Sequence, residues 1–284
     1  MKTLLSIGHG YSASALERLL VPLGWKIIAT TRSEEKASEF RARGLEAVVW
    51  PDADLSSHIK AATHVLLSVA PNEAGDPVLA ACRDAFEKTS FDWVGYLSTT
   101  GVYGDHQGGW VDERTPTSPS TKRGQLRVAA EAEWSQLELP LHIFRLAGIY
   151  GPERGPFAKV RHGTARRIIK PGQVFSRIHV DDIAHTLLAS IKQPRAGAIY
   201  NLCDDDPAPP EDVIAFAAEL LGLPVPEAED FETAEMTPMA RSFYAESKKV
   251  RNNLIKEELG VELIYKDYRS ALRQMLENEK TRTD

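Results

Sequence analysis

Short apolar runs alternate along the first half of the chain with segments in which apolar residues recur every three or four positions. The runs predict strands buried on both faces, since such strands are apolar at consecutive positions. They lie at Leu4 to Ile7, Lys26 to Thr30, Ala47 to Trp50, Val65 to Val69, Val94 to Leu97 and Leu141 to Arg145. Their spacing predicts βαβ units and a parallel sheet with helices on both faces.

Helices are predicted between these strands. The first follows from leucines spaced i, i+3, i+4 and i+7, namely Leu16, Leu19, Leu20 and Leu23. Ser33 is a suitable N-cap for the next helix, and Glu34 and Glu35 suit its positive end. Further helices are expected around 56–62, 76–88 and 122–137.

The alternation changes after Gly151, where proline and glycine interrupt a stretch of short elements. A helix is predicted from Asp182 to Ile191, with Asp181 as its N-cap, and Ile199 to Leu202 is expected to return to the sheet as a strand. Pro209 or Pro210 then opens another helix. The last third therefore reads as a smaller, mixed unit.

Composition and charge narrow the possible classes of protein. The chain has 284 residues, 43% of them hydrophobic and 26% charged, with a net charge of −6. These values exclude a disordered chain and disfavour a nucleic-acid partner. The two cysteines, Cys82 and Cys203, lack CxxC spacing, and no apolar run is long enough for a signal peptide core or a membrane span. We expect a cytoplasmic protein with packed thiols and no membrane partner.

A glycine-rich turn follows the first predicted strand and leads directly into a helix. It reads Gly8-His9-Gly10-Tyr11-Ser12-Ala13. In a strand–turn–helix context this pattern predicts a dinucleotide site, in which the first Gly permits the turn, the second lets the pyrophosphate approach, and Ala13 allows close packing. Backbone N–H groups at the start of the helix then meet the phosphates. The alternative is a turn without a ligand.

The end of the second predicted strand bears on which nicotinamide cofactor binds. An NAD site usually carries an acidic residue there, whereas this chain has Thr31, Arg32 and Ser33. Arg32 could pair with a 2′-phosphate, assisted by the hydroxyl groups, so NADP(H) is predicted to be preferred over NAD(H). The alternative is an exposed arginine at the end of a strand.

Four further motifs resemble the extended short-chain dehydrogenase/reductases, the NAD(P)-dependent epimerase/dehydratase superfamily. They are Leu97-Ser98-Thr99-Thr100-Gly101-Val102-Tyr103-Gly104, Val111-Asp112-Glu113, Arg145-Leu146-Ala147-Gly148-Ile149-Tyr150-Gly151-Pro152 and Arg177-Ile178-His179-Val180-Asp181-Asp182. The segment Ser247-Lys248-Lys249-Val250-Arg251-Asn252, with Leu259-Gly260, resembles an atypical subgroup.

The resemblance implies a Rossmann-type, doubly wound and mostly parallel seven-stranded sheet with a smaller C-terminal substrate unit. Residues 1–152 would bind the cofactor, with 178–202 returning to that domain, and 153–177 and 203–284 would bind a substrate. Helices near 76–88 and 122–137 can form a homodimer interface. The implied cofactor contacts are Gly8, Gly10, Tyr11, Ser12, Ala13, Thr31, Arg32, Asp54, Leu55, Ser68, Val69, Ala70 and Arg127.

The superfamily's chemistry uses a hydroxyl, a tyrosine that transfers a proton, and a lysine that holds the ribose and lowers the tyrosine pKa. Thr99 stands at the hydroxyl position. Counting back from Glu131 places Arg127 at the lysine position and Arg123 at the tyrosine position. Arginine stays protonated and cannot exchange a proton. Both arginines could hold an anionic ligand or simply belong to a charged helix face.

Three residues remain as candidate substrate contacts: Tyr103, Arg177 and His179. Arg177 resembles a phosphate-contacting arginine of the superfamily's nucleotide-sugar members. Tyr103 and His179 have structural alternatives, because Tyr103 belongs to a motif in which tyrosine is usually packed and His179 begins the turn into a helix. His9 is expected to touch cofactor or solvent. Glu153-Arg154 and Arg166-Arg167 add charge near the predicted pocket without forming a recognisable site, and no residues show metal-ligand spacing.

Two functions follow. The first is an oxidoreductase or epimerase-like enzyme with a substituted active site, acting on a small carbonyl or nucleotide-sugar-like substrate. The second is a non-catalytic NADP(H)-binding sensor or regulator. Thr99 and the predicted pocket favour the first, and the missing tyrosine favours the second. Both require a small-molecule ligand, and neither requires nucleic acid.

Overall fold

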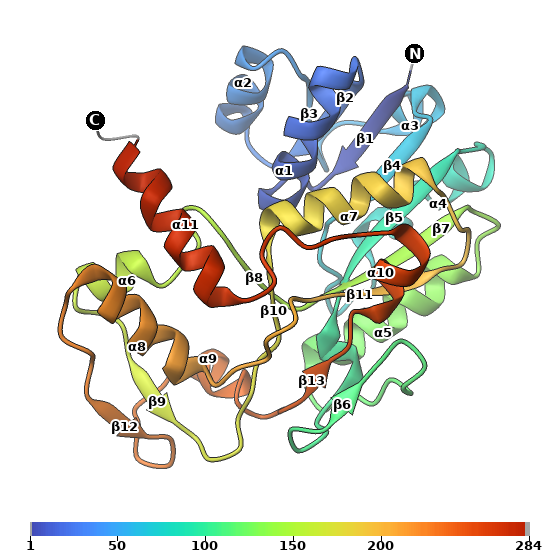
Figure 1. Cartoon of the computed structure of the whole chain (residues 1–284). Coiled ribbons are helices and arrows are strands. Elements are labelled where there is room, and N and C mark those ends of the chain that lie inside the picture. The colour runs from blue at the N-terminus through green and yellow to red at the C-terminus, as the bar shows by residue number, and fades with distance from the viewer. Residues whose placement is uncertain (1, 282–284) are drawn as a thin grey trace.

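The computed structural model describes residues 2–281, and a seven-stranded sheet forms its centre (Figure 1). The strands are β1 (Thr3–Ile7), β2 (Lys26–Thr31), β3 (Glu46–Val49), β4 (His64–Leu67), β5 (Trp93–Thr99), β7 (Leu141–Leu146) and β11 (Ile199–Leu202). They lie in the order β11-β7-β5-β4-β1-β2-β3, and every neighbouring pair is parallel. The predicted doubly wound α/β fold is confirmed.

Helices precede and follow the strands. They are α1 (Tyr11–Leu20), α2 (Glu34–Ala42), α3 (Ser56–Ala61), α4 (Pro77–Glu87), α5 (Lys122–Ser135), α6 (Phe157–Arg161), α7 (Val180–Lys192), α8 (Pro210–Leu221), α9 (Pro238–Ser242), α10 (Asn253–Leu259) and α11 (Tyr268–Thr281). Of these, α1 to α5, α7 and α8 lie where the sequence predicts them. Two 3₁₀ turns, η1 (Val21–Leu23) and η2 (Thr100–Tyr103), extend the first helix and the fifth strand. Leu23, expected on the first helix, therefore lies in η1.

Alternate strand residues face two separate cores. Leu4 and Leu66 pack with Leu16 of α1 and Leu187 of α7 on one face of the sheet. Their neighbours along the strands face the other side and pack with α3, α4 and α5. Because both faces are covered, the strands are apolar at nearly every position, as their sequences predicted.

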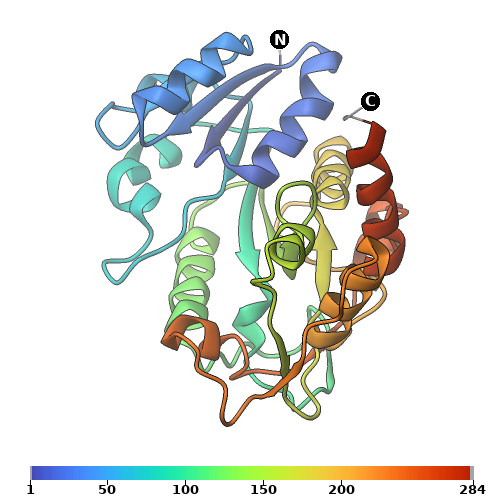
Figure 2. The ribbon, with the colours of Figure 1, turned by 90° about the vertical axis from the view of Figure 1, so that its left-hand side faces the viewer.

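A third core lies outside the sheet. α6, α8 and α11 pack around Phe157, Ala217 and Leu272. Three short parallel pairs connect this region to the rest of the chain: β6 (Trp110–Val111) with β13 (Lys249–Val250), β8 (Gly148–Tyr150) with β10 (Arg177–His179), and β9 (Arg167–Ile169) with β12 (Ala228–Asp230). Figure 2 shows α6, α8 and α11 beside the carboxyl ends of the strands.

Two local predictions are changed by the structure. The N-cap of α7 is His179 rather than Asp181, because the His179 imidazole accepts the Asp181 N–H at 3.2 Å. The long C-terminal helix α11 was not predicted, although Tyr268, Leu272 and Met275 form an apolar face at helical spacing. No helix of the described chain is long and apolar enough to cross a membrane.

Candidate functional site

The sheet has a topological switch point between β1 and β4. From β1 the chain continues to β2 and β3 on one side, and β4 starts the other half of the sheet. Ligands of open α/β sheets bind outside the carboxyl ends of the strands at such a point. Here the glycine-rich turn follows β1 and Ser68-Val69-Ala70 follows β4, so the implied cofactor contacts from these two segments lie at the same edge of the sheet, where a ligand crevice is expected.

The two glycines of the turn are required for different reasons. Gly8 has φ +81°, and a Cβ there would lie 2.9 Å from Val69 Cγ2, so backbone and packing both require glycine. Gly10 has φ −111°, a value that any residue can adopt. A Cβ on Gly10 would meet only the Gly8 carbonyl oxygen, at 3.7 Å. The protein itself does not need a glycine at Gly10, which caps α1 beside open space.

His9 does not face this space. Its side chain is buried, its Nε2 lies 2.9 Å from Glu17 Oε2, and its ring packs against Phe40. The expectation that His9 touches cofactor or solvent is therefore wrong, because its side chain is buried against Glu17 of α1 and Phe40 of α2. Ser12 and Ala13 are likewise buried where α1 packs on the sheet.

Arg32 lies exposed at the end of β2 and makes no hydrogen bond or ion pair within residues 2–281. Thr31, beside it, accepts a weak contact from the Ser33 N–H at 3.5 Å, and Ser33 caps α2 as predicted. Asp54 is exposed and accepts the Ser56 N–H and hydroxyl, which lower its pKa. Leu55 is buried beneath it.

Arg127 reaches the same edge of the sheet from α5. Its Nη1 donates to Tyr96 Oη and to the Leu97 carbonyl, both at 2.9 Å, and lies 3.5 Å from the Val69 carbonyl. Arg127 thus joins the carboxyl ends of β4 and β5. Burial raises the pKa of its partner Tyr96 to about 12, so Tyr96 stays a neutral hydroxyl that accepts this bond.

Arg123 and Thr99, the other two positions matched to the superfamily's catalytic residues, lie at the start of α5 and at the end of β5. The guanidinium of Arg123 is exposed and stacks on the ring of Phe243, with Cζ 4.4 Å from the ring centroid. Thr99 is half-buried, and its Oγ1 accepts the Gly101 N–H at 3.1 Å, which leaves the hydroxyl hydrogen able to donate.

A buried network lies beneath this edge. Arg145 pairs with Glu131, at 2.7 Å from Nη2 to Oε2, and donates from Nη1 to Tyr103 Oη at 3.0 Å. Tyr103 in turn donates to Asn201 Oδ1 at 2.7 Å. Tyr103 is fully buried and both capacities of its hydroxyl are used, so its position does not fit a substrate contact. Glu131, from which the tyrosine and lysine positions were counted, thus anchors α5 to the sheet through Arg145.

The other two candidate substrate contacts, Arg177 and His179, also make hydrogen bonds within the chain. Arg177 donates from Nη1 to the Phe175 carbonyl at 2.8 Å and the Ala208 carbonyl at 3.0 Å. His179 is buried as the cap of α7, and burial lowers its pKa to about 4. Both side chains hold elements together, and nothing in their contacts marks a substrate site.

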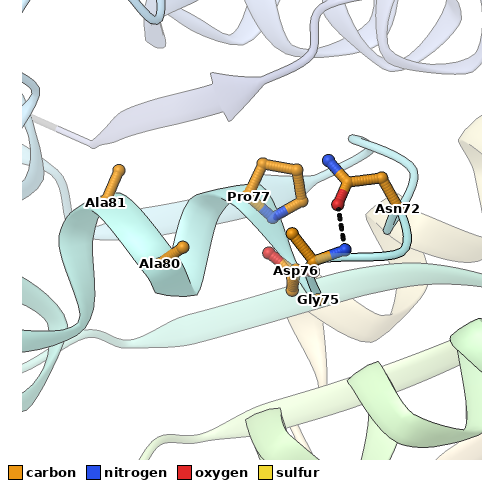
Figure 3. A pocket seen from close by; sticks show the side chains of 7 residues that line it. Asn72, Gly75, Asp76, Pro77, Ala80 and Ala81 are labelled. Carbon is orange, nitrogen blue, oxygen red and sulfur yellow. Dashed lines mark hydrogen bonds between the residues drawn. The ribbon is translucent and has the colours of Figure 1, made fainter.

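A shallow hollow lies beside the crevice, where the loop after β4 meets α4 (Figure 3). It is lined by Asn72, Ala74, Gly75, Asp76, Pro77, Ala80 and Ala81. The Asp76 carboxylate caps α4 and also accepts Trp134 Nε1–H at 3.1 Å. Because its one charged group is occupied, we do not consider this hollow a ligand site.

The comparisons agree with this architecture. A conserved protein of unknown function from Silicibacter pomeroyi is 56% identical, with a TM-score of 0.94 over 99% of this chain and 100% of that one. A protein assigned as an NAD-dependent epimerase/dehydratase of Methylobacillus flagellatus is 26% identical, with a TM-score of 0.75 over 98% of each chain. The chain therefore has the fold of the extended short-chain dehydrogenase/reductase superfamily, to which its motifs are similar.

More distant relatives have the same fold or a similar sequence. Protein YeeZ of Escherichia coli K12 is 28% identical over 245 residues, 80% of this chain and 86% of YeeZ. Two solved structures at 18% identity share the fold, each with a TM-score of 0.76. MoeE5, solved in complex with UDP-glucose and NAD, matches over 99% of this chain and 100% of its own. The human epimerase family protein SDR39U1, solved with NADPH, matches over 97% of this chain and 99% of its own. No protein-family model matches the sequence.

Sequence reasoning missed Tyr96 and Phe243, the partners of the two arginines. Tyr96 lies inside an apolar strand and reads as core, and Phe243 is 120 residues from Arg123. No local spacing connects either pair.

Proposed function

We propose that this chain binds NADP(H) in the crevice between β1 and β4 and does not use it for tyrosine-dependent carbonyl chemistry. The observation that carries the proposal is Gly10. It is a glycine that neither its backbone angles nor its packing requires, at the N-terminus of a helix whose first N–H groups are free for a phosphate. The cofactors bound by MoeE5 and SDR39U1 support a nicotinamide dinucleotide as the ligand.

The preference for the phosphorylated cofactor rests on Arg32. An exposed guanidinium without an ion pair in the described chain, at the end of β2, suits a 2′-phosphate. The missing proton transfer rests on Arg123 and Arg127. One stacks on Phe243 and the other joins two strand ends, so both are occupied in protein contacts rather than positioned to act as acid or base.

Titration of the protein with NADPH and NADH by calorimetry tests the binding proposal. NADPH should bind at least about tenfold more tightly, because one charge-assisted contact to the 2′-phosphate is worth roughly that factor. Arg32→Ala should remove the preference, whereas Arg43→Ala, an exposed arginine already paired with Glu17, should keep it. Equal affinities in the wild type, or an unchanged preference in Arg32→Ala, would contradict the proposal.

An enzyme with a substituted site is the second candidate, and Thr99 favours it. Its hydroxyl can still donate at the end of β5, where a substrate carbonyl would lie. The two candidates differ in turnover. NADPH oxidation against a panel of carbonyl compounds should be negligible in the wild type and should rise in Arg123→Tyr/Arg127→Lys, since a positioned acid contributes ~10²–10⁴-fold. Fast wild-type turnover would favour the enzyme.

A further inference from the structure

The turn that follows β8 is fastened to the first residue of α1. Tyr11 Oη donates to the Pro152 carbonyl at 2.8 Å, and Gly151 and Arg154 exchange backbone hydrogen bonds of 3.3 and 3.0 Å across the turn. Glu153, between them, has φ +62°. Figure 2 shows this segment, which leads to α6, next to the start of α1. The turn from Gly151 to Arg154, here called the 151–154 turn, therefore borders the phosphate end of the crevice.

Gly151 shows that this close approach is built into the sequence. It has φ +154°, and a Cβ there would lie 2.5 Å from Tyr11 Oη and 2.8 Å from Val180 Cγ1. His179 Nε2, a buried atom without a hydrogen-bond partner in the described chain, would lie 3.3 Å from the same Cβ. Any side chain at Gly151 would push the 151–154 turn away from α1.

The 151–154 turn brings one cation to α1. Arg154 is exposed and makes no ion pair within residues 2–281, and its Cζ lies 5.7 Å from the centroid of the Tyr11 ring. Burial raises the pKa of Tyr11 to about 12, and the positive charge of Arg154 acts in the opposite direction by lowering it. A guanidinium whose face packs on a ring keeps its N–H edge available to an anion.

We propose that Arg154 binds the diphosphate of the nicotinamide cofactor, opposite the N–H groups that begin α1. The inference rests on the proposed function, because it requires a dinucleotide in the crevice. The ligand group is the diphosphate rather than the 2′-phosphate, since Arg154 lies over Tyr11 at the start of α1, whereas the 2′-phosphate belongs at the end of β2 with Arg32. Arg154 is thus a cofactor-binding residue from outside the glycine-rich turn.

The two arginines make separable contributions, which gives a sharp test. Arg154→Ala should weaken NADPH, NADH and ADP-ribose by the same factor, about tenfold, because all three carry the diphosphate. Arg32→Ala should weaken NADPH alone. Arg161→Ala is the matched control, because Arg161 is an exposed arginine of the adjacent α6 that is already paired with Glu279. It should leave all three affinities unchanged.

The possible outcomes distinguish the two proposals. Wild-type protein that binds none of the three ligands would overturn the proposed function itself. Wild-type binding with unchanged affinities in Arg154→Ala, or a loss confined to NADPH, would overturn the role of Arg154 alone. Arg154→Lys, which keeps the charge, should recover part of the affinity and make binding more sensitive to salt than in Arg154→Ala. A lysine variant as weak as the alanine variant would indicate a purely structural role.

Discussion

Two glycines only two residues apart show how one turn combines structural and functional requirements. Gly8 is held by its own backbone angle and by Val69, so its requirement belongs to the fold. Gly10 is free of both constraints, and under the proposed function its glycine is required by the cofactor. The sequence pattern already assigns the turn to Gly8 and the approach of a pyrophosphate to Gly10, and the structure adds the contact with Val69 to the first.

Substitutions at the two positions should therefore have opposite consequences. Gly10→Val should leave the thermal unfolding temperature close to that of the wild type and abolish NADPH binding, because the side chain fills the space of the pyrophosphate. Gly8→Ala should destabilise the fold by at least about 1–2 kcal/mol, the cost of a left-handed backbone for a residue with a Cβ. Calorimetric titration and thermal unfolding of both variants decide this. Unchanged binding in Gly10→Val would show that the phosphates bind elsewhere.

At the scale of elements, α5 depends on a close approach at its first turn. Thr121 caps the helix by accepting the Gly124 N–H at 3.2 Å. Gly124 is buried, and a Cβ there would lie 2.8 Å from the Gly101 carbonyl oxygen of η2 and 2.5 Å from Pro119 Cβ. α5 therefore approaches η2 so closely that Gly124 has no room for a side chain, and this packing places Arg127 beside Tyr96.

Helix propensity and packing predict opposite effects for Gly124→Ala. Alanine favours a helix by about 1 kcal/mol over glycine, whereas overpacking typically costs about 1–3 kcal/mol. Because the Cβ would meet a backbone oxygen rather than a flexible side chain, we expect net destabilisation, measured by urea unfolding. The control is Gln125→Ala, an exposed position on the same helix, which should change stability by less than about 0.5 kcal/mol. A more stable Gly124→Ala protein would contradict the close packing.

The strands and most helices could be predicted because apolar periodicity is local. Ser33 as a cap and Leu16 on an apolar face need only their neighbours in sequence. The candidate site could be predicted only where it is local too, as in the glycine-rich turn. The contacts of Arg123 with Phe243 and of Tyr11 with Pro152 join distant segments, and packing rather than spacing determines them.

At the scale of the whole molecule, charged groups lie buried where the third core meets the sheet. Asp204 follows β11 and is 1% exposed, and one of its carboxylate oxygens has no hydrogen-bond partner in the described chain. The positive charge of Arg177 opposes this burial by lowering the pKa of Asp204. Burial raises the pKa of Asp204 to about 8 and lowers the pKa of Arg177. For both groups, burial therefore outweighs their mutual attraction.

The burial of Asp204 should make the stability of the protein depend on pH. The folded state keeps the Asp204 proton up to about pH 8, whereas the unfolded chain releases it near 3.8. Between those values the folded state binds more protons, so Asp204 lowers the free energy of unfolding as pH rises, by up to about 1.4 kcal/mol per pH unit. Asp204→Asn has no proton to lose, so its stability relative to the wild type should increase steadily from pH 5 to pH 8.5 in urea unfolding. The variant keeps an acceptor for the Asp206 N–H. If Asp204→Asn instead becomes less stable than the wild type at pH 8.5, attraction to Arg177 exceeds the cost of burial, and Asp204 is ionised in the folded protein.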